Sequence, residues 1–149
     1  MIEIKDETEK VILVGVALSD QDDTKESLEE LKDLVSTAGA ETAGMLIQNR
    51  EQQHPATYVG KGKIEELKNM IWELRATGIV CDDELSPAQM KNLQDELDVK
   101  VMDRTLIILD IFAARASTSE GKIQVELAQL RYRSARLVGL RSSLSRLGG

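Results

Sequence analysis

Cysteine, histidine and aromatic side chains are scarce in this sequence, and each scarcity excludes a class of site. A single cysteine, Cys81, rules out a disulfide framework and a cysteine-based zinc site, and it fits a reducing cytoplasm. His54 is the only histidine and has no serine or cysteine motif near it, so we predict no catalytic residues. Aromatic residues make up 3% of the chain, so Val, Ile, Leu and Ala must build the core.

Long apolar segments are also missing. No apolar run reaches the 18 residues that a membrane-spanning helix needs. The first residues, MIEIKDETEK, are charged where a secretory signal peptide has an apolar centre. We therefore expect a soluble, cytoplasmic protein without a membrane span.

Basic residues are rare in the first two thirds of the chain and dominate the last third. Residues 1–103 carry 11 basic and 23 acidic side chains, whereas residues 104–149 carry 8 basic and 3 acidic ones. The formal net charge of −7 therefore combines an acidic body with a basic arm. Such asymmetry indicates that the arm faces a polyanion.

Four segments of the acidic body have the composition of buried strands. The clearest is Val11–Leu18, a continuous apolar run of the kind found in parallel sheets buried on both faces. Between the segments, apolar residues recur at helical spacing, and Gly39 ends the first such stretch. We predict an α/β domain over residues 1–103, with a small, four-stranded, mostly parallel sheet and flanking helices. The strands are expected at Val11–Leu18, Glu41–Gln48, Ile79–Cys81 and Val99–Met102, and the helices after Asp23, from Ile64 and from Ser86.

Local signals predict how three segments begin. Asp23 with Glu26 has the spacing of a capping box, in which a side chain accepts from the first helical N–H groups. Ser86 followed by Pro87 and Gln89 has the same signature with proline at the first helical position. Tyr58-Val59 is predicted as a short extended piece before the next helix.

Residues 104–149 change to a purely helical pattern, which we predict to be a long arm. Apolar residues here step by 4, 3, 4 and 3, which is the a/d spacing of a helix that packs on another helix. The partner remains open: this domain, a second copy in a homodimer, or further sequence. Ser117–Gly121 interrupts the arm, so either one bent helix or two helices satisfies the pattern. The a/d positions are Ile123, Leu127, Leu130, Ser134 and Leu137.

Two short motifs have the residue types of an anion or metal site. Gly60, Lys61, Gly62 and Lys63 lead into a helix, and N–H groups with two lysines there suit a phosphate. The competing interpretation is a glycine turn with solvated lysines, because the spacing matches no P-loop. Three adjacent carboxylates at Asp82–Glu84 suit Mg²⁺, but such a run is more often a solvated turn before a capped helix, and we predict no metal site.

The arginines of the arm are the stronger signal. From Arg131 to the last residue the chain carries five arginines and no acidic residue. Arginine binds phosphates in a bidentate manner and stacks on bases, so we predict contact with RNA. A solvated helix face that balances the acidic body is the alternative. The arginines are Arg131, Arg133, Arg136, Arg141 and Arg146.

Six motifs are spread along the chain: YVGKGK at 58–63, DDELSPAQ at 82–89, DRT at 103–105, LDIFA at 109–113, EGKIQVELAQL at 120–130 and LSRLGG at 144–149. Together they resemble the HflX family of ribosome-associated GTPases. The resemblance runs from about Val11 to the last residue, with the motifs in consistent order.

The resemblance implies that this chain is a non-catalytic, regulatory N-terminal part of such a GTPase. The longer protein would bind the large ribosomal subunit and its rRNA and act in ribosome splitting or rescue under stress. Its own C-terminal GTPase domain, GTP and Mg²⁺ would lie outside this sequence, which has no P-loop. LSRLGG would begin a glycine-rich loop joining two antiparallel helices, and residues 104–149 would be half of that hairpin. The implied ribosome-binding set is Arg131, Arg133, Arg136, Arg141, Ser145, Arg146, Gly148 and Gly149.

A different class of function also remains. A stand-alone α/β module that binds or hydrolyses ATP or GTP would use Gly60–Lys63 for phosphate and the acidic cluster after the third strand for a metal. The family resemblance favours the docking function over this alternative.

Overall fold

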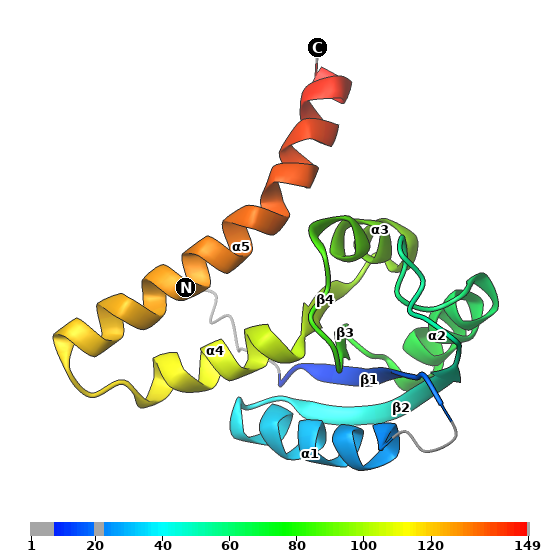
Figure 1. Cartoon of the computed structure of the whole chain (residues 1–149), viewed down its shortest axis with the longest axis horizontal. Coiled ribbons are helices and arrows are strands. Elements are labelled where there is room, and N and C mark those ends of the chain that lie inside the picture. The colour runs from blue at the N-terminus through cyan, green and yellow to red at the C-terminus, as the bar shows by residue number, and fades with distance from the viewer. Residues whose placement is uncertain (1–7, 20–22, 149) are drawn as a thin grey trace, which may run out of the picture.

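The computed structural model describes residues 8–19 and 23–148, with side chains up to Arg136. Figure 1 shows a strand–helix alternation followed by one helix that runs away from the sheet and a longer helix that runs back and continues past it. The strands are β1 (Lys10–Ala17), β2 (Glu41–Asn49), β3 (Gly78–Cys81) and β4 (Lys100–Asp103). The helices are α1 (Thr24–Thr37), α2 (Lys61–Leu74), α3 (Pro87–Leu97), α4 (Arg104–Arg115) and α5 (Ser119–Gly148).

The four strands form one sheet in the order β2-β1-β3-β4, and every pairing is parallel. This confirms the predicted fold class. The central strand β1 is the apolar run that the sequence identified, and its residues from Val11 to Ala17 are buried. Because β2 lies on one side of β1 and β3 on the other, the chain reverses its direction of winding between β1 and β3. In open α/β sheets, ligands bind outside the carboxyl ends of the strands at such a reversal.

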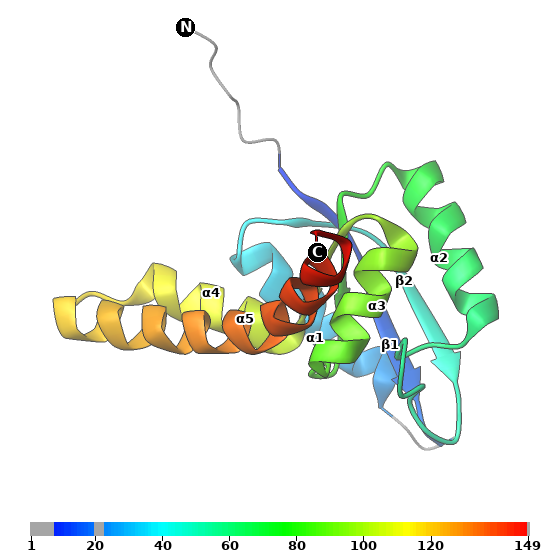
Figure 2. The ribbon, with the colours of Figure 1, turned by 90° about the horizontal axis from the view of Figure 1, so that it is seen from above.

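Helices cover both faces of the sheet. Helix α1 lies on one face, and α2 and α3 lie on the other, as Figures 1 and 2 show. Helix α4 packs against α1, and α5 returns along α4 and also contacts α3. The core is aliphatic, as expected from the few aromatic residues, with Ile12, Leu13, Leu28 and Leu93 fully buried.

One predicted helix cap is confirmed and one is wrong. Ser86 and Gln89 form both bonds of the capping box: the Gln89 N–H donates to Ser86 Oγ at 3.0 Å, and the Ser86 N–H donates to Gln89 Oε1 at 2.9 Å. Asp23 lies at the N-cap of α1, but its side chain accepts no capping bond. Its φ and ψ of −87° and 26° lie outside the extended region that lets an N-cap side chain fold back.

Tyr58 does not form an extended segment as predicted. Its φ is +65°, in the left-handed region, and its backbone exchanges two hydrogen bonds with His54. The chain therefore turns tightly here and carries the tyrosine ring into the core. Helix α2 then begins at Lys61, three residues before the predicted Ile64, with Gly60 as its N-cap.

The arm consists of two helices, which settles the ambiguity around Ser117–Gly121. Ala116, with ψ of 122°, ends α4. The Gly121 N–H donates to Thr118 Oγ1 at 3.0 Å at the start of α5. Helix α5 continues through Gly148, so residues 144–148, which the resemblance assigned to the start of a loop, are helical in the structure. Within the described part of the chain, no helix is long and apolar enough to cross a membrane.

Candidate nucleic-acid interface

A buried aspartate joins the body to the arm. Asp103, at the end of β4, has no exposed surface. Its Oδ1 accepts from the Leu106 N–H at 3.0 Å, which caps α4, and its Oδ2 accepts from the Leu85 N–H at 2.9 Å. The Tyr132 hydroxyl of α5 also donates to Oδ2. One carboxyl group therefore ties together α4, the loop after β3, and α5.

Arg136 makes the second connection between α5 and the body. Its Nη2 donates to the Leu85 carbonyl at 2.7 Å, and its Nη1 donates to the Tyr132 carbonyl at 3.1 Å. The guanidinium carbon lies 3.3 Å from the centre of the Tyr132 ring. An exposed carboxylate, Glu84, lies 3.7 Å from Nη2. With its side chain only 11% exposed, Arg136 points into the protein, although the sequence placed it among the RNA-binding residues.

Tyr132 is held in its protonated form by this arrangement. Burial, followed by the hydrogen bond to Asp103, raises the pKa of the Tyr132 hydroxyl above its ordinary value. A protonated hydroxyl donates one bond, and Asp103 accepts it. The raised pKa therefore extends the contact above the pH of about 10 at which an ordinary tyrosine loses its proton.

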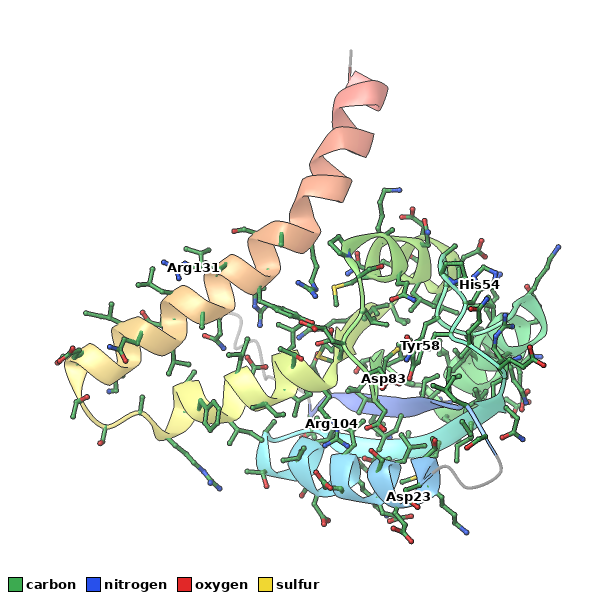
Figure 3. All side chains as sticks on the ribbon, in the orientation of Figure 1. Asp23, His54, Tyr58, Asp83, Arg104 and Arg131 are labelled. Carbon is green, nitrogen blue, oxygen red and sulfur yellow. The ribbon has the colours of Figure 1, made fainter. Side chains whose placement is uncertain are left out.

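Arg104 fixes the start of α4 against α1. Its Nη2 donates to Asp82 Oδ1 at 2.7 Å and to the Ser27 carbonyl at 2.9 Å, and its Nη1 donates to Glu30 Oε1 at 2.9 Å. Burial alone would lower the pKa of Arg104, but the bonds to Asp82 and Glu30 outweigh it and raise the pKa. Figure 3 shows the side chain at the junction of the two helices.

The carboxylates of Asp82 and Asp83, which follow β3, are bonded to other side chains of this protein. Arg104 pairs with Asp82, and the Tyr58 hydroxyl donates to Asp83 Oδ2 at 2.5 Å. Burial raises the pKa of Tyr58, with further contributions from Cys81 and the bond to Asp83. Among the described residues, no group of three His, Cys, Asp or Glu side chains is arranged to hold a metal ion.

Gly60–Lys63 forms the first turn of α2 and no separate loop. The Gly60 N–H donates to Gln48 Oε1 at 2.7 Å, so it is not free for a phosphate. A Cβ at Gly60 would lie 2.7 Å from Arg50 Nη1, the end of a flexible side chain that can move aside. Lys63 pairs with Glu66 at 2.9 Å, while Lys61 and Gly62 are exposed. These contacts favour the interpretation as a helix start with solvated lysines.

The remaining arm arginines differ in how they are held. Arg131 is exposed, and Figure 3 shows it on the side of α5 that faces away from α4. Arg133 is half exposed and lies 3.5 Å from Asp110 of α4. Arg141, Ser145, Arg146 and Gly148 belong to the part of α5 after Arg136, where the structure describes the backbone alone. Gly149 lies outside the described residues.

The predicted a/d seam faces away from the body. Ile123, Leu127 and Leu130 are 57%, 44% and 61% exposed. Helix α5 uses a different face to pack on the body, with Val125, Ala128 and Tyr132 half-buried. This domain is therefore not the partner of the exposed residues, and a second copy or a further helix remains as a prediction.

The sequence did not identify Asp103 and Tyr132 as the connection between body and arm. The N-cap position of Asp103 before a helix was a usable signal. Tyr132 had no such signal, because a single tyrosine between two arginines is equally consistent with a basic surface.

Known proteins resemble this chain along its whole length. A family model described as GTP-binding GTPase N-terminal matches residues 25–113, and one described as GTP-binding GTPase Middle Region matches residues 115–149. A GTPase HflX from Lacrimispora saccharolytica is 71% identical over 149 residues, which are 100% of this chain and 35% of the relative. This chain belongs to the HflX family of GTPases. It corresponds to the N-terminal part of the family's proteins.

A less similar HflX protein also matches most of this chain. GTPase HflX of Escherichia coli is 44% identical over 138 residues, covering 93% of this chain and 32% of the relative. The chain thus spans about a third of the length of these curated relatives. A crystal structure of a GTP-binding protein from Sulfolobus solfataricus in complex with GDP has a TM-score of 0.66 and 25% identity, over 91% of this chain and 40% of that one.

Proposed function

We propose that this chain is the ribosome-docking, regulatory part of an HflX-type GTPase and that α5 carries its contact with rRNA of the large subunit. The observation that carries the proposal is the end of the arm. From Arg131 onward α5 has five arginines and no acidic residue, on a body that is strongly acidic. Such a distribution attracts RNA to the arm and repels it from the body.

The anchorage of α5 supports the same function. Asp103 and Arg136 hold the helix to the body at two points. Exposed Arg131 is then presented in a defined direction. Pre-organised presentation reduces the entropy lost when a helix binds. Arg136 contributes here by positioning the helix and not by contacting RNA.

The proposal extends to a longer protein. Relatives named GTPase HflX are about three times as long as this chain. We assign GTP and Mg²⁺ to a GTPase domain of that longer protein, and a cytoplasmic role in ribosome splitting or rescue to the whole. The exposed seam at Ile123, Leu127 and Leu130 would then receive a second helix.

Co-sedimentation with purified large ribosomal subunits tests the docking function. We expect Arg131→Glu combined with Arg146→Glu to weaken binding at least tenfold. The slope of log affinity against log salt should fall by about 1 for each lost phosphate contact. The matched control is Lys25→Glu combined with Lys32→Glu, which makes the same charge change at exposed positions on α1.

The control should bind like the unaltered chain. Equal loss in both double variants would show a general effect of net charge and contradict a specific role of the arm. Binding that ignores salt and both substitutions in α5 would also contradict it.

A further inference from the structure

A small cavity lies in the angle between α5 and the body. Its volume is about 160 Å³, and its floor consists of Met90 from α3, Val101 and Met102 from β4, and Leu106 from α4. These four side chains are buried. For comparison, an apolar cavity of about 150 Å³ in another protein takes up benzene. The space therefore suits an apolar body about the size of one aromatic ring.

The rim of the cavity is charged and mainly basic. Lys100, Arg133 and Arg136 line it, together with one acidic residue, Asp110. Asp110 is already engaged, because Gln129 donates to its Oδ1 at 2.7 Å and Arg133 lies 3.5 Å from the same atom. Lys100 Nζ lies 3.3 Å from Glu9 Oε1, and Arg136 Nη2 lies 3.7 Å from Glu84 Oε1. The group left for an anion at the rim is therefore the Nε of Arg136.

One donor on this rim has no partner. The Nε of Arg136 is buried and makes no hydrogen bond within the described part of the structure. A buried N–H of a charged group without an acceptor is costly, and such groups usually have a partner. An acceptor oxygen from a ligand in the cavity would satisfy it.

We propose that this cavity binds a small amphipathic anion, with a single-ring or similarly sized apolar body and a carboxylate head. The body packs on Met90, Met102 and Leu106. The carboxylate accepts from Arg136. A ligand in this position touches α3, β4 and α5 at once, so its binding favours the docked position of the arm.

Methyl-labelled methionine NMR with benzoate as the probe tests the site. The chain has five methionines, and Met90 and Met102 line the cavity while Met45 and Met70 do not. We expect benzoate to shift the Met90 and Met102 signals alone, with an affinity of about 1 mM for a ligand of this size. Benzyl alcohol, which keeps the ring and lacks the charge, should bind at least tenfold more weakly, and benzylamine should not bind.

Variants separate the cavity from the general charge of the arm. Gln94→Trp, at the rim on α3, should fill the space and abolish the shifts without altering a charged residue. Arg136→Lys should weaken benzoate about tenfold, whereas Arg131→Gln, on the opposite side of α5, should leave it unchanged. Unaltered Met45 and Met70 signals report that each variant is folded.

Three results would overturn the proposal. The first is the absence of any shift at Met90 and Met102 up to about 50 mM benzoate, well above the expected affinity. The second is equal binding of benzoate and benzyl alcohol, which would reduce the site to an apolar gap. The third is loss of benzoate binding in Arg131→Gln, which would place the anion on the exposed arm.

Discussion

The guanidinium of Arg136 stacks on the ring of Tyr132, one turn earlier on α5, at 3.3 Å from the guanidinium carbon to the ring centre. Both side chains also reach the same loop: Arg136 bonds the Leu85 carbonyl, and Tyr132 bonds Asp103, which holds the Leu85 N–H. The peptide groups on both sides of Leu85 are thus occupied by the connection to α5.

This pairing predicts that Arg136 stabilises the protein by geometry more than by charge. Arg136→Lys keeps the charge but loses the planar fork and the stacking, and we expect it to cost about 1–3 kcal/mol of unfolding free energy in urea. Arg131→Lys, exposed on the same helix, should change the value by less than about 0.5 kcal/mol. Equal effects of the two substitutions would mean that the contacts of Arg136 do not matter for stability.

Tyr58 predicts a specific loss of stability at high pH. Its folded pKa is raised, so the folded protein keeps the proton when the unfolded chain releases it near its ordinary value. The stabilisation from Tyr58 is therefore complete below pH of about 10 and decreases as the pH rises above it. Tyr58→Phe should be less stable than the unaltered protein at pH 7 by about 1–2 kcal/mol, because it loses the bond to Asp83.

The difference between Tyr58→Phe and the unaltered protein should shrink between pH 9 and 11. Urea unfolding across this range measures it directly. Comparing the two proteins cancels the contributions of Cys81 and Tyr132, whose pKa values are also raised by burial. A constant difference across the range would contradict a raised pKa for Tyr58.

The two faces of α5 predict different effects of an introduced charge on stability. Leu130→Glu places a carboxylate on the exposed seam and should change the stability of this chain by less than about 0.5 kcal/mol. Val125→Glu places it on the half-buried face toward α4 and should cost about 1–3 kcal/mol. Light scattering on the same samples tests the predicted homodimer, because Leu130→Glu should dissociate a dimer formed through the seam.

Two glycines predict opposite signs for the same substitution. A Cβ at Gly78 would lie 2.7 Å from the Lys100 carbonyl oxygen, so Gly78→Ala must push β3 from β4 and should cost about 1–3 kcal/mol. A Cβ at Gly62 meets nothing within 4 Å in the first turn of α2, so Gly62→Ala should stabilise the protein by about 0.5–1 kcal/mol. Thermal unfolding of both variants measures the sign of each change in stability.

Local patterns in the sequence predicted the parts of the fold that depend on local chemistry. The apolar run at Val11–Leu18 identified the central strand, and Ser86 with Gln89 identified a capping box that forms both of its bonds. Asp23 had the same signature without the bond, because its φ and ψ lie outside the extended region that an N-cap side chain needs. The left-handed conformation of Tyr58 had no signal, since tyrosine rarely adopts it.

The candidate site was harder to predict because it depends on which face of α5 meets the body. Apolar spacing selected Ile123, Leu127 and Leu130, which are exposed. The packed face instead uses Tyr132 and Arg136, whose polar groups bond to Asp103 and Leu85. Hydrophobic periodicity cannot detect a contact made through hydrogen bonds. The high arginine content of the segment predicted that all its arginines face solvent, including Arg136.

The position of Arg136 along α5 makes the helix a lever. Gly148 lies twelve positions further along, which is about 18 Å of helix at 1.5 Å per residue. A tilt of about 10° at Arg136 would therefore move the far end by about 3 Å, roughly the length of one hydrogen bond. A small displacement of the loop at Leu85 is thus a larger displacement at the C-terminal end of α5. The position of that end therefore depends on how rigidly the loop at Leu85 is held.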